Sequence, residues 1–214
     1  IHLIKEKKQT LCVLSGHGEK DIKGQAEDDY ELAKKELEEQ AYQIKEVNLV
    51  LEAKIPADCD AISILGPTKA FLDVELKLLQ NYLDQGGRAF IAIDVNMQGR
   101  EPMEHFHKML EEWHIRATKA LIVDPLSRLL GVEARIPLIA TFSKEHSITK
   151  EFQMNCFFPF SRPLEIIPGA PAGMNIKWLT KTTPKSWGET SFSDLSKNQA
   201  QLNDVDKAGP LITA

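Results

Sequence analysis

Residues Thr10–Ser15 read TLCVLS and lead directly into Gly16-His17-Gly18-Glu19. A short, continuously apolar run that stops at a glycine predicts a buried β-strand. Three later runs have the same character: residues 61–65 (AISIL), 89–93 (AFIAI) and 120–123 (ALIV). Strands that are apolar throughout, rather than alternating with polar residues, are typical of parallel sheets that are covered on both faces.

Helical patterns separate these strands. Apolar residues recur at helical spacing over residues 30–41, 72–83 and 103–113, and residues 42–50 predict one more strand. Gly86-Gly87 follows the second helical pattern, where a glycine C-cap is expected. Strands that alternate with helices predict an α/β fold, and we expect a flavodoxin-like, doubly wound and mostly parallel sheet.

The rhythm changes after Asp124, where prolines and polar residues interrupt the pattern. Residues 137–142 and 176–180 are candidate strands, and residues 191–207 are polar enough to predict a loop. We therefore expect residues 1–125 to form the α/β sheet domain and residues 126–214 to form an elaboration packed on that same domain.

The composition excludes some classes of function. The 214 residues carry a net charge of −5, with no basic stripe, so a nucleic-acid partner is not expected. No apolar run approaches the roughly 20 residues that a membrane helix needs. The chain begins at Ile1 rather than Met, and we therefore expect a segment of a longer protein whose anchors lie elsewhere.

The three cysteines, Cys12, Cys59 and Cys156, are far apart and form no CxxC motif. An odd number gives no closed disulfide framework. Because Cys12 lies in an apolar strand, we expect it to be a buried, inert thiol. Cysteine content alone does not fix the cellular compartment.

The most suggestive polar cluster follows the first strand. His17 and Glu19 lie on its glycine loop, and Asp94 follows the strand at 89–93, so all three are expected at the carboxyl edge where open α/β sheets bind ligands. We take His17, Glu19 and Asp94 as candidate ligand-binding residues. A metal site that adds Asp124 is an alternative, and another is that the glycines merely allow a tight turn.

Known catalytic and cofactor motifs are missing. A dinucleotide-binding GxGxxG motif would need glycine at Asp21, and neither a phosphate-binding Walker motif nor the hydrolase GxSxG elbow occurs. We therefore predict no catalytic residues, no metal and no cofactor.

Taken in order, a series of weak motifs resembles one family. The series comprises Gly16-His17-Gly18-Glu19, Ile55-Pro56, Asp58-x-Asp60, Ile62–Leu65, Gly66-Pro67, Glu75, Leu78-Leu79, Tyr82-Leu83, Gly86-Gly87, Asp94, Trp113-His114-Ile115, Val123-Asp124, Glu145–Thr149, Ser161-Arg162, Ser186-Trp187 and Gly209-Pro210. It resembles the GldG-type auxiliary components of ABC transport systems, which include subunits associated with gliding motility. The resemblance covers nearly the whole chain. One departure is Trp113-His114, where a glycine commonly precedes the isoleucine. The fold also resembles a domain of intraflagellar transport proteins.

This resemblance implies a non-catalytic domain on the extracytoplasmic (periplasmic) side of the inner membrane, anchored by helices outside this segment. It also implies ABC permease and ATPase subunits as partners, with a role in protein–protein interaction. Two alternatives stay open: a module that binds a small solute such as a saccharide, and a degenerate hydrolase.

Overall fold

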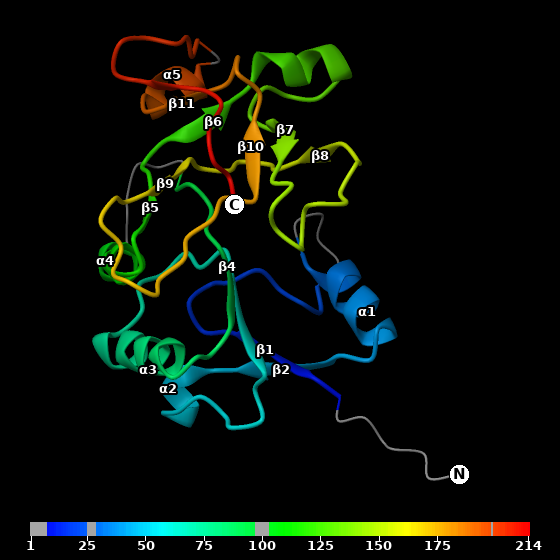
Figure 1. The fold of residues 1–214 in the computed structure, drawn as a ribbon, viewed down its shortest axis with the longest axis vertical. Coiled ribbons are helices and arrows are strands. Elements are labelled where there is room, and N and C mark those ends of the chain that lie inside the picture. The colour runs from blue at the N-terminus through cyan, green and yellow to red at the C-terminus, as the bar shows by residue number, and fades with distance from the viewer. Residues whose placement is uncertain (1–7, 25–28, 97–102, 198) are drawn as a thin grey trace. The chain divides into compact units, whose positions relative to one another are not determined.

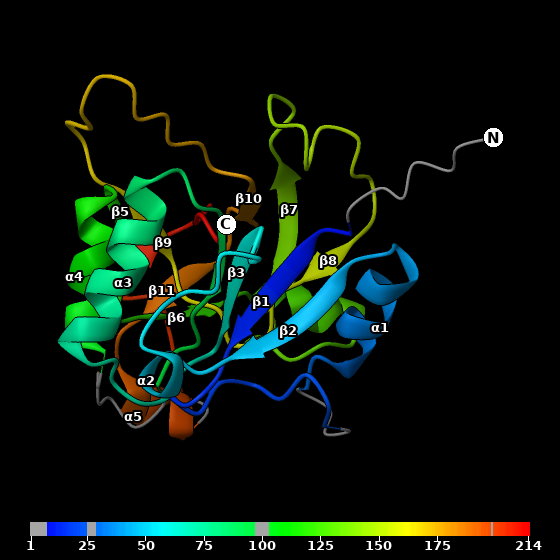
Figure 2. The ribbon, with the colours of Figure 1, turned by 90° about the horizontal axis from the view of Figure 1, so that it is seen from below.

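The apolar runs near the N-terminus form a parallel sheet in the computed structural model, which describes residues 8–24, 29–96, 103–197 and 199–214. The strands are β1 (Thr10–Leu14), β2 (Gln43–Val47), β3 (Ala61–Leu65) and β4 (Ala89–Ala92). They are all parallel, in the order β2-β1-β3-β4, and Figure 2 shows β2, β1 and β3 side by side. The expected α/β class with a parallel sheet is therefore confirmed.

The described residues of this part of the chain form the helices α1 (Glu31–Glu39), α2 (Leu49–Glu52) and α3 (Asp73–Asp84). Right-handed crossovers in opposite directions along the sheet place α1 and α3 on opposite faces, as Figure 2 shows. The α3 helix ends as its glycines predict, because Gly86 adopts φ +86° and the Gly87 N–H donates to the Tyr82 carbonyl at 2.9 Å.

The chain divides into two units: residues 1–92 with 102–106, and residues 93–101 with 107–214. The elements after β4 are α4 (Glu104–Glu112), β5 (Ile115–Ala117), β6 (Leu121–Val123), the 3₁₀ helix η1 (Pro125–Leu130), β7 (Leu138–Phe142), β8 (Cys156–Phe157), β9 (Leu164–Ile166), β10 (Thr180–Thr182), β11 (Trp187–Glu189), α5 (Phe192–Ser196) and β12 (Lys207–Ala208) (Figure 1). Within the described residues, no helix has the length and apolar character needed to cross a membrane.

Among the described residues of the second unit, every strand pair is antiparallel. The three sheets have the strand orders β10-β7-β8, β12-β11-β6 and β5-β9. The run at residues 120–123 does form a strand, but our placement of it in the parallel sheet is wrong, since β6 pairs antiparallel with β11. The expected loop at 191–207 also contains α5 and the first residue of β12. A continuous apolar run predicts that a strand is buried. It does not reveal whether the neighbouring strand runs parallel or antiparallel to it.

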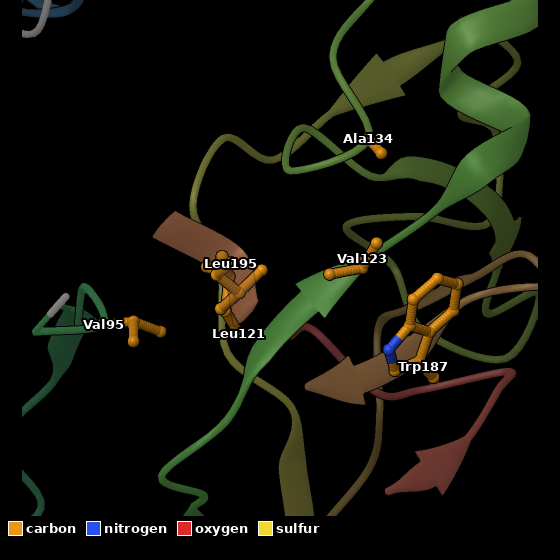
Figure 3. Packing of buried hydrophobic residues seen from close by; sticks show 6 residues of the cluster. All are labelled: Val95, Leu121, Val123, Ala134, Trp187 and Leu195. Atoms are coloured by element: carbon orange, nitrogen blue, oxygen red, sulfur yellow. The ribbon is translucent and has the colours of Figure 1, made fainter. Parts of the chain in front are cut away.

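Each unit has apolar packing of its own. In the first, Val13, Ile22 and Leu65 form a buried cluster. In the second, the cluster is Val95, Leu121, Val123, Ala134, Trp187 and Leu195 (Figure 3). Trp187 therefore acts as a packing residue.

The expectation for Cys12 is wrong. Cys12 is fully buried in β1, but it forms a disulfide with Cys59 in the loop before β3, and Cys156 is the free cysteine. The bond joins two cysteines that are 47 residues apart in the sequence. Sequence alone did not pair them, because their proximity depends on β1 and β3 being neighbours in the sheet.

The departure at Trp113-His114 also has a structural explanation. His114 adopts φ +58°, a left-handed conformation that favours glycine. Its ring Nδ1 lies 3.1 Å from the Ile167 carbonyl oxygen, a contact that glycine could not make.

Candidate functional site

The loop after β1 needs both of its glycines. Gly16 has φ +117° and Gly18 has φ +73°, so both lie in the left-handed region. A Cβ at Gly16 would lie 2.8 Å from the Asn48 side chain, and one at Gly18 would collide with Thr68 Oγ1. The loop is thus packed between the segments that follow β2 and β3.

This loop buries His17 between two carboxylates. His17 Nε2 lies 3.0 Å from Glu75 Oε2, and His17 Nδ1 lies 3.3 Å from Glu19 Oε1. Glu19 Oε2 also accepts from the His17 backbone N–H at 2.7 Å. The side chains are only 7% (His17), 3% (Glu19) and 1% (Glu75) exposed.

Further contacts fix the histidine. Its ring stacks on Phe71 with a centroid distance of 4.1 Å, and Phe71 stacks on Phe106 at 5.1 Å. The His17 carbonyl accepts from the backbone N–H groups of Thr68 and Lys69 at 2.8 and 2.9 Å. The loop after β1 is therefore tied to the segment between β3 and α3.

Glu75 is a neighbour of His17 that the sequence analysis named in its motif series but did not place at this site. It is the third residue of α3, and its Oε2 accepts from the Leu72 N–H at 2.8 Å as well as contacting His17. A glutamate at this position is a known N-terminal signal, because it can cap the preceding backbone N–H. That signal gives no hint of a histidine 58 residues earlier in the chain.

We call His17, Glu19 and Glu75 the histidine clamp. Each ring nitrogen of His17 thus lies within hydrogen-bond distance of one carboxylate oxygen. The His17 ring is covered and stacked, so it presents no open face to a substrate. The described residues contain no group of three or more His, Cys, Asp or Glu side chains that could hold a metal ion.

A cavity of about 340 Å³ does adjoin the same loop. Gly16, Gly18 and Glu19 line it, together with Lys23 and Glu46, whereas His17 does not. The hydrogen bond from Lys23 to Glu46, at 2.6 Å, lowers the pKa of the Glu46 carboxyl below its ordinary value.

The other two predicted acids lie in the second unit. Asp94 is exposed, and its carbonyl oxygen accepts a hydrogen bond from Arg162. Asp124 is fully buried at the end of β6, where Oδ1 accepts from Leu126 N–H at 3.1 Å and from Thr183 Oγ1 at 3.0 Å. Because β6 lies outside the parallel sheet, the expectation that Asp124 ends a strand of that sheet is wrong. The structure thus brings His17 and Glu19 together, while Asp94 and Asp124 have surroundings of their own.

Four exposed apolar side chains accompany the clamp at the carboxyl edge of the parallel sheet. Val50 and Leu51 lie on α2 after β2, and Leu72 and Val74 lie at the start of α3 after β3. Each is more than half exposed. Both views draw α2 beside α3 (Figures 1 and 2). We call these four residues the apolar edge.

Comparison with known proteins gives one family match. The profile of the family described as "ABC-type uncharacterized transport system" matches residues 8–214. No curated protein matches the chain.

Among solved structures, the one described as "mmIFT52 N-terminal domain" is similar, with a TM-score of 0.58 and 14% sequence identity. The similarity covers 81% of this chain and 73% of that one. A putative thua-like protein from Bacteroides uniformis gives a TM-score of 0.48 and 13% identity over 83% of this chain and 68% of its own. At such low identity, the first likeness concerns the fold alone, and it agrees with the resemblance to intraflagellar transport proteins.

Proposed function

Because the chain belongs to the ABC-type transport-system auxiliary family, which its profile match over residues 8–214 shows, we propose that it is a non-catalytic, extracytoplasmic domain of an accessory subunit. Membership of a transport system implies partnership with transporter components. We propose specifically that the permease and the ATPase are those partners and that the domain acts through protein–protein contact. No nucleic-acid partner is expected at a net charge of −5.

The apolar edge is the observation that carries the interaction role. Large exposed apolar side chains that gather on one surface are typical of protein–protein contacts. Here four of them follow β2 and β3, the strands on either side of β1, and the histidine clamp holds the loop that follows β1 in place. We propose that the apolar edge contacts a membrane-embedded subunit of the transport system.

The Cys12–Cys59 disulfide supports the extracytoplasmic location. Structural disulfides form and persist in oxidising compartments such as the bacterial periplasm, and they are rare in the cytosol. Attachment to the inner membrane, through helices outside this segment, is part of the same proposal.

The proposal also covers the subfamily, the type of sheet and the role of His17. The ordered motifs of the sequence support a GldG-type, gliding-motility-associated subunit. The strand order β2-β1-β3-β4 supports a flavodoxin-like sheet that stops at four strands. The engaged nitrogens and low exposure of His17 favour a structural role over catalysis, which disfavours the degenerate hydrolase.

The proposal is tested by purifying the full-length parent protein from its native membrane in mild detergent and identifying what accompanies it by mass spectrometry. We expect an ABC permease and ATPase to co-purify, and Leu51→Lys with Val74→Lys to reduce their recovery. Leu32→Lys is the matched control, because Leu32 is an equally exposed apolar residue on α1. Recovery of the parent protein without transporter subunits would overturn the proposal.

The cavity lined by Glu19 favours one second candidate, a module that binds a small solute such as a saccharide. A ligand at 100 times its dissociation constant adds about 2.7 kcal/mol to folding stability. Thermal stabilisation by a sugar that disappears in Glu19→Gln would support this candidate over the first.

A further inference from the structure

The second unit contains a cavity that the proposed function does not use. Its volume is about 660 Å³, within the usual range of small-molecule sites. Val123 of β6, Ala134, Trp187 of β11 and Leu195 of α5 line it, and these residues also belong to the buried cluster of Figure 3. These apolar side chains form one part of the wall, and polar atoms form the larger share of the lining.

Trp187 contributes carbon atoms of its ring to the cavity lining and has no free hydrogen-bond donor there. Its indole Nε1 already donates to the buried Glu189 carboxylate at 3.2 Å. Glu189 Oε1 accepts from the Ser191 N–H at 2.8 Å, so both carboxylate oxygens of Glu189 are engaged. A ligand would meet the indole ring only through apolar contact.

The charged residues that line the cavity are Arg128, Glu133 and Arg135. Arg135 donates to Glu133 at 2.8 Å, and its guanidinium lies 5.7 Å from the centre of the Phe160 ring. Arg128, exposed on η1, makes no side-chain ion pair or hydrogen bond with any part of the chain that the structure describes. Two guanidinium groups thus face one carboxylate, which leaves the lining with one positive charge.

Because the lining combines a patch of apolar side chains with an arginine that no carboxylate compensates, we propose that the cavity binds a small amphiphile: an aliphatic body against Trp187 and Leu195, with an anionic head on Arg128. Guanidinium groups bind carboxylates and phosphates through paired N–H donors, so either head would suit. The ligand could be a free fatty acid or a membrane phospholipid, which share this chemistry.

Calorimetric titration of the purified chain with three ten-carbon probes tests the proposal: decanoate, decanol and decyltrimethylammonium, each below its micellar concentration. We expect decanoate to bind about tenfold more tightly than decanol, and the cation to bind least. Phosphatidylglycerol vesicles form a fourth arm. Binding to vesicles in addition to decanoate would identify lipid as a source of the ligand, and binding to decanoate alone would identify the free acid.

Two variants locate the site. Arg128→Ala should remove the preference for decanoate over decanol, whereas Arg116→Ala, an exposed arginine outside the cavity, should leave it unchanged. Ser196→Trp, at an exposed position of the lining, should fill the space and abolish binding of both probes. Circular dichroism checks that each variant is folded. Equal affinity for all three probes, the same loss in Arg116→Ala, or binding to vesicles alone would overturn the proposal.

Discussion

At the level of single residues, the clamp explains why a histidine can be buried in this loop. Glu75 and Glu19 lose most of their hydration on folding, and the His17 ring supplies a polar partner to each of them. Glu75 Oε1 is buried and has no hydrogen bond to any described residue, so Glu75 depends heavily on its other oxygen. Removing the ring would leave two buried carboxylates without their shared partner.

We therefore predict that His17→Ala lowers the free energy of unfolding by about 2–5 kcal/mol, because two buried carboxylates each lose a hydrogen-bond partner. Urea denaturation measures this loss. The matched control is His105→Ala, because His105 pairs with Asp73 at 2.8 Å on the exposed surface of the same unit. An exposed pair should contribute less than about 1 kcal/mol, so equal losses in the two variants would contradict the account.

A second prediction concerns Glu46. Its pKa is lowered by the hydrogen bond from Lys23, so the folded protein holds the charged form more strongly than the unfolded chain does. The stabilisation from this pair is therefore present above the unfolded pKa of Glu46 and is lost as the pH falls through the lower, folded pKa.

Carboxyl ¹³C NMR follows this titration directly. We expect Glu46 to titrate below an ordinary glutamate and to return toward the ordinary value in Lys23→Met. Lys45→Met is the control, because Lys45 pairs with Asp58 instead, at 3.1 Å. An unchanged Glu46 titration in Lys23→Met would show that Lys23 is not the cause.

At the level of elements, the Cys12–Cys59 disulfide links β1 to the loop that enters β3. A bond that closes about 47 residues should stabilise the fold by about 4 kcal/mol in the chain-entropy description. We predict that the double variant Cys12→Ala, Cys59→Ala loses stability of this order, whereas Cys156→Ser leaves the disulfide intact.

Thiol titration of the unfolded chain checks the pairing. We expect one reactive thiol before reduction and three after it, since Cys156 is the free cysteine. In the folded chain that thiol should react slowly at neutral pH, because burial raises the pKa of Cys156. Three thiols without any reductant would contradict the disulfide.

The elements also show where sequence reasoning succeeds. The expected strand at 61–65 is β3 itself, and the helix expected at 72–83 is α3 at Asp73–Asp84, because continuous apolar runs and helical spacing are local signals. The pairing of β6 was not accessible in this way. Its partner β11 reads Trp-Gly-Glu, which carries no strand pattern, and the two meet 64 or more residues apart in the chain.

The candidate site was predictable only in part, for the same reason. Glycines around His17 and Glu19 mark a loop at the end of a strand, and the structure does bring those two side chains together. Glu75 and Phe71 enter the site through tertiary packing, which leaves no trace in the local pattern.

At the level of the whole molecule, the two units offer different surfaces. The first carries the apolar edge and the second carries the amphiphile cavity, and neither proposal depends on the other. The ordered series of weak motifs indicated an ABC transport auxiliary family, and the profile match confirms that assignment. A single one of these motifs covers too little of the chain to identify the family.

The central claim is that the apolar edge contacts the transporter, and site-specific photo-crosslinking tests it most directly. The full-length protein would carry benzoylphenylalanine at Leu51, or at Leu32 as the control, in its native membrane before irradiation. The account predicts a crosslink from position 51 to a membrane-embedded subunit of the ABC system and none from position 32. Crosslinks from both positions alike, or from position 51 only to proteins outside the transport system, would contradict it.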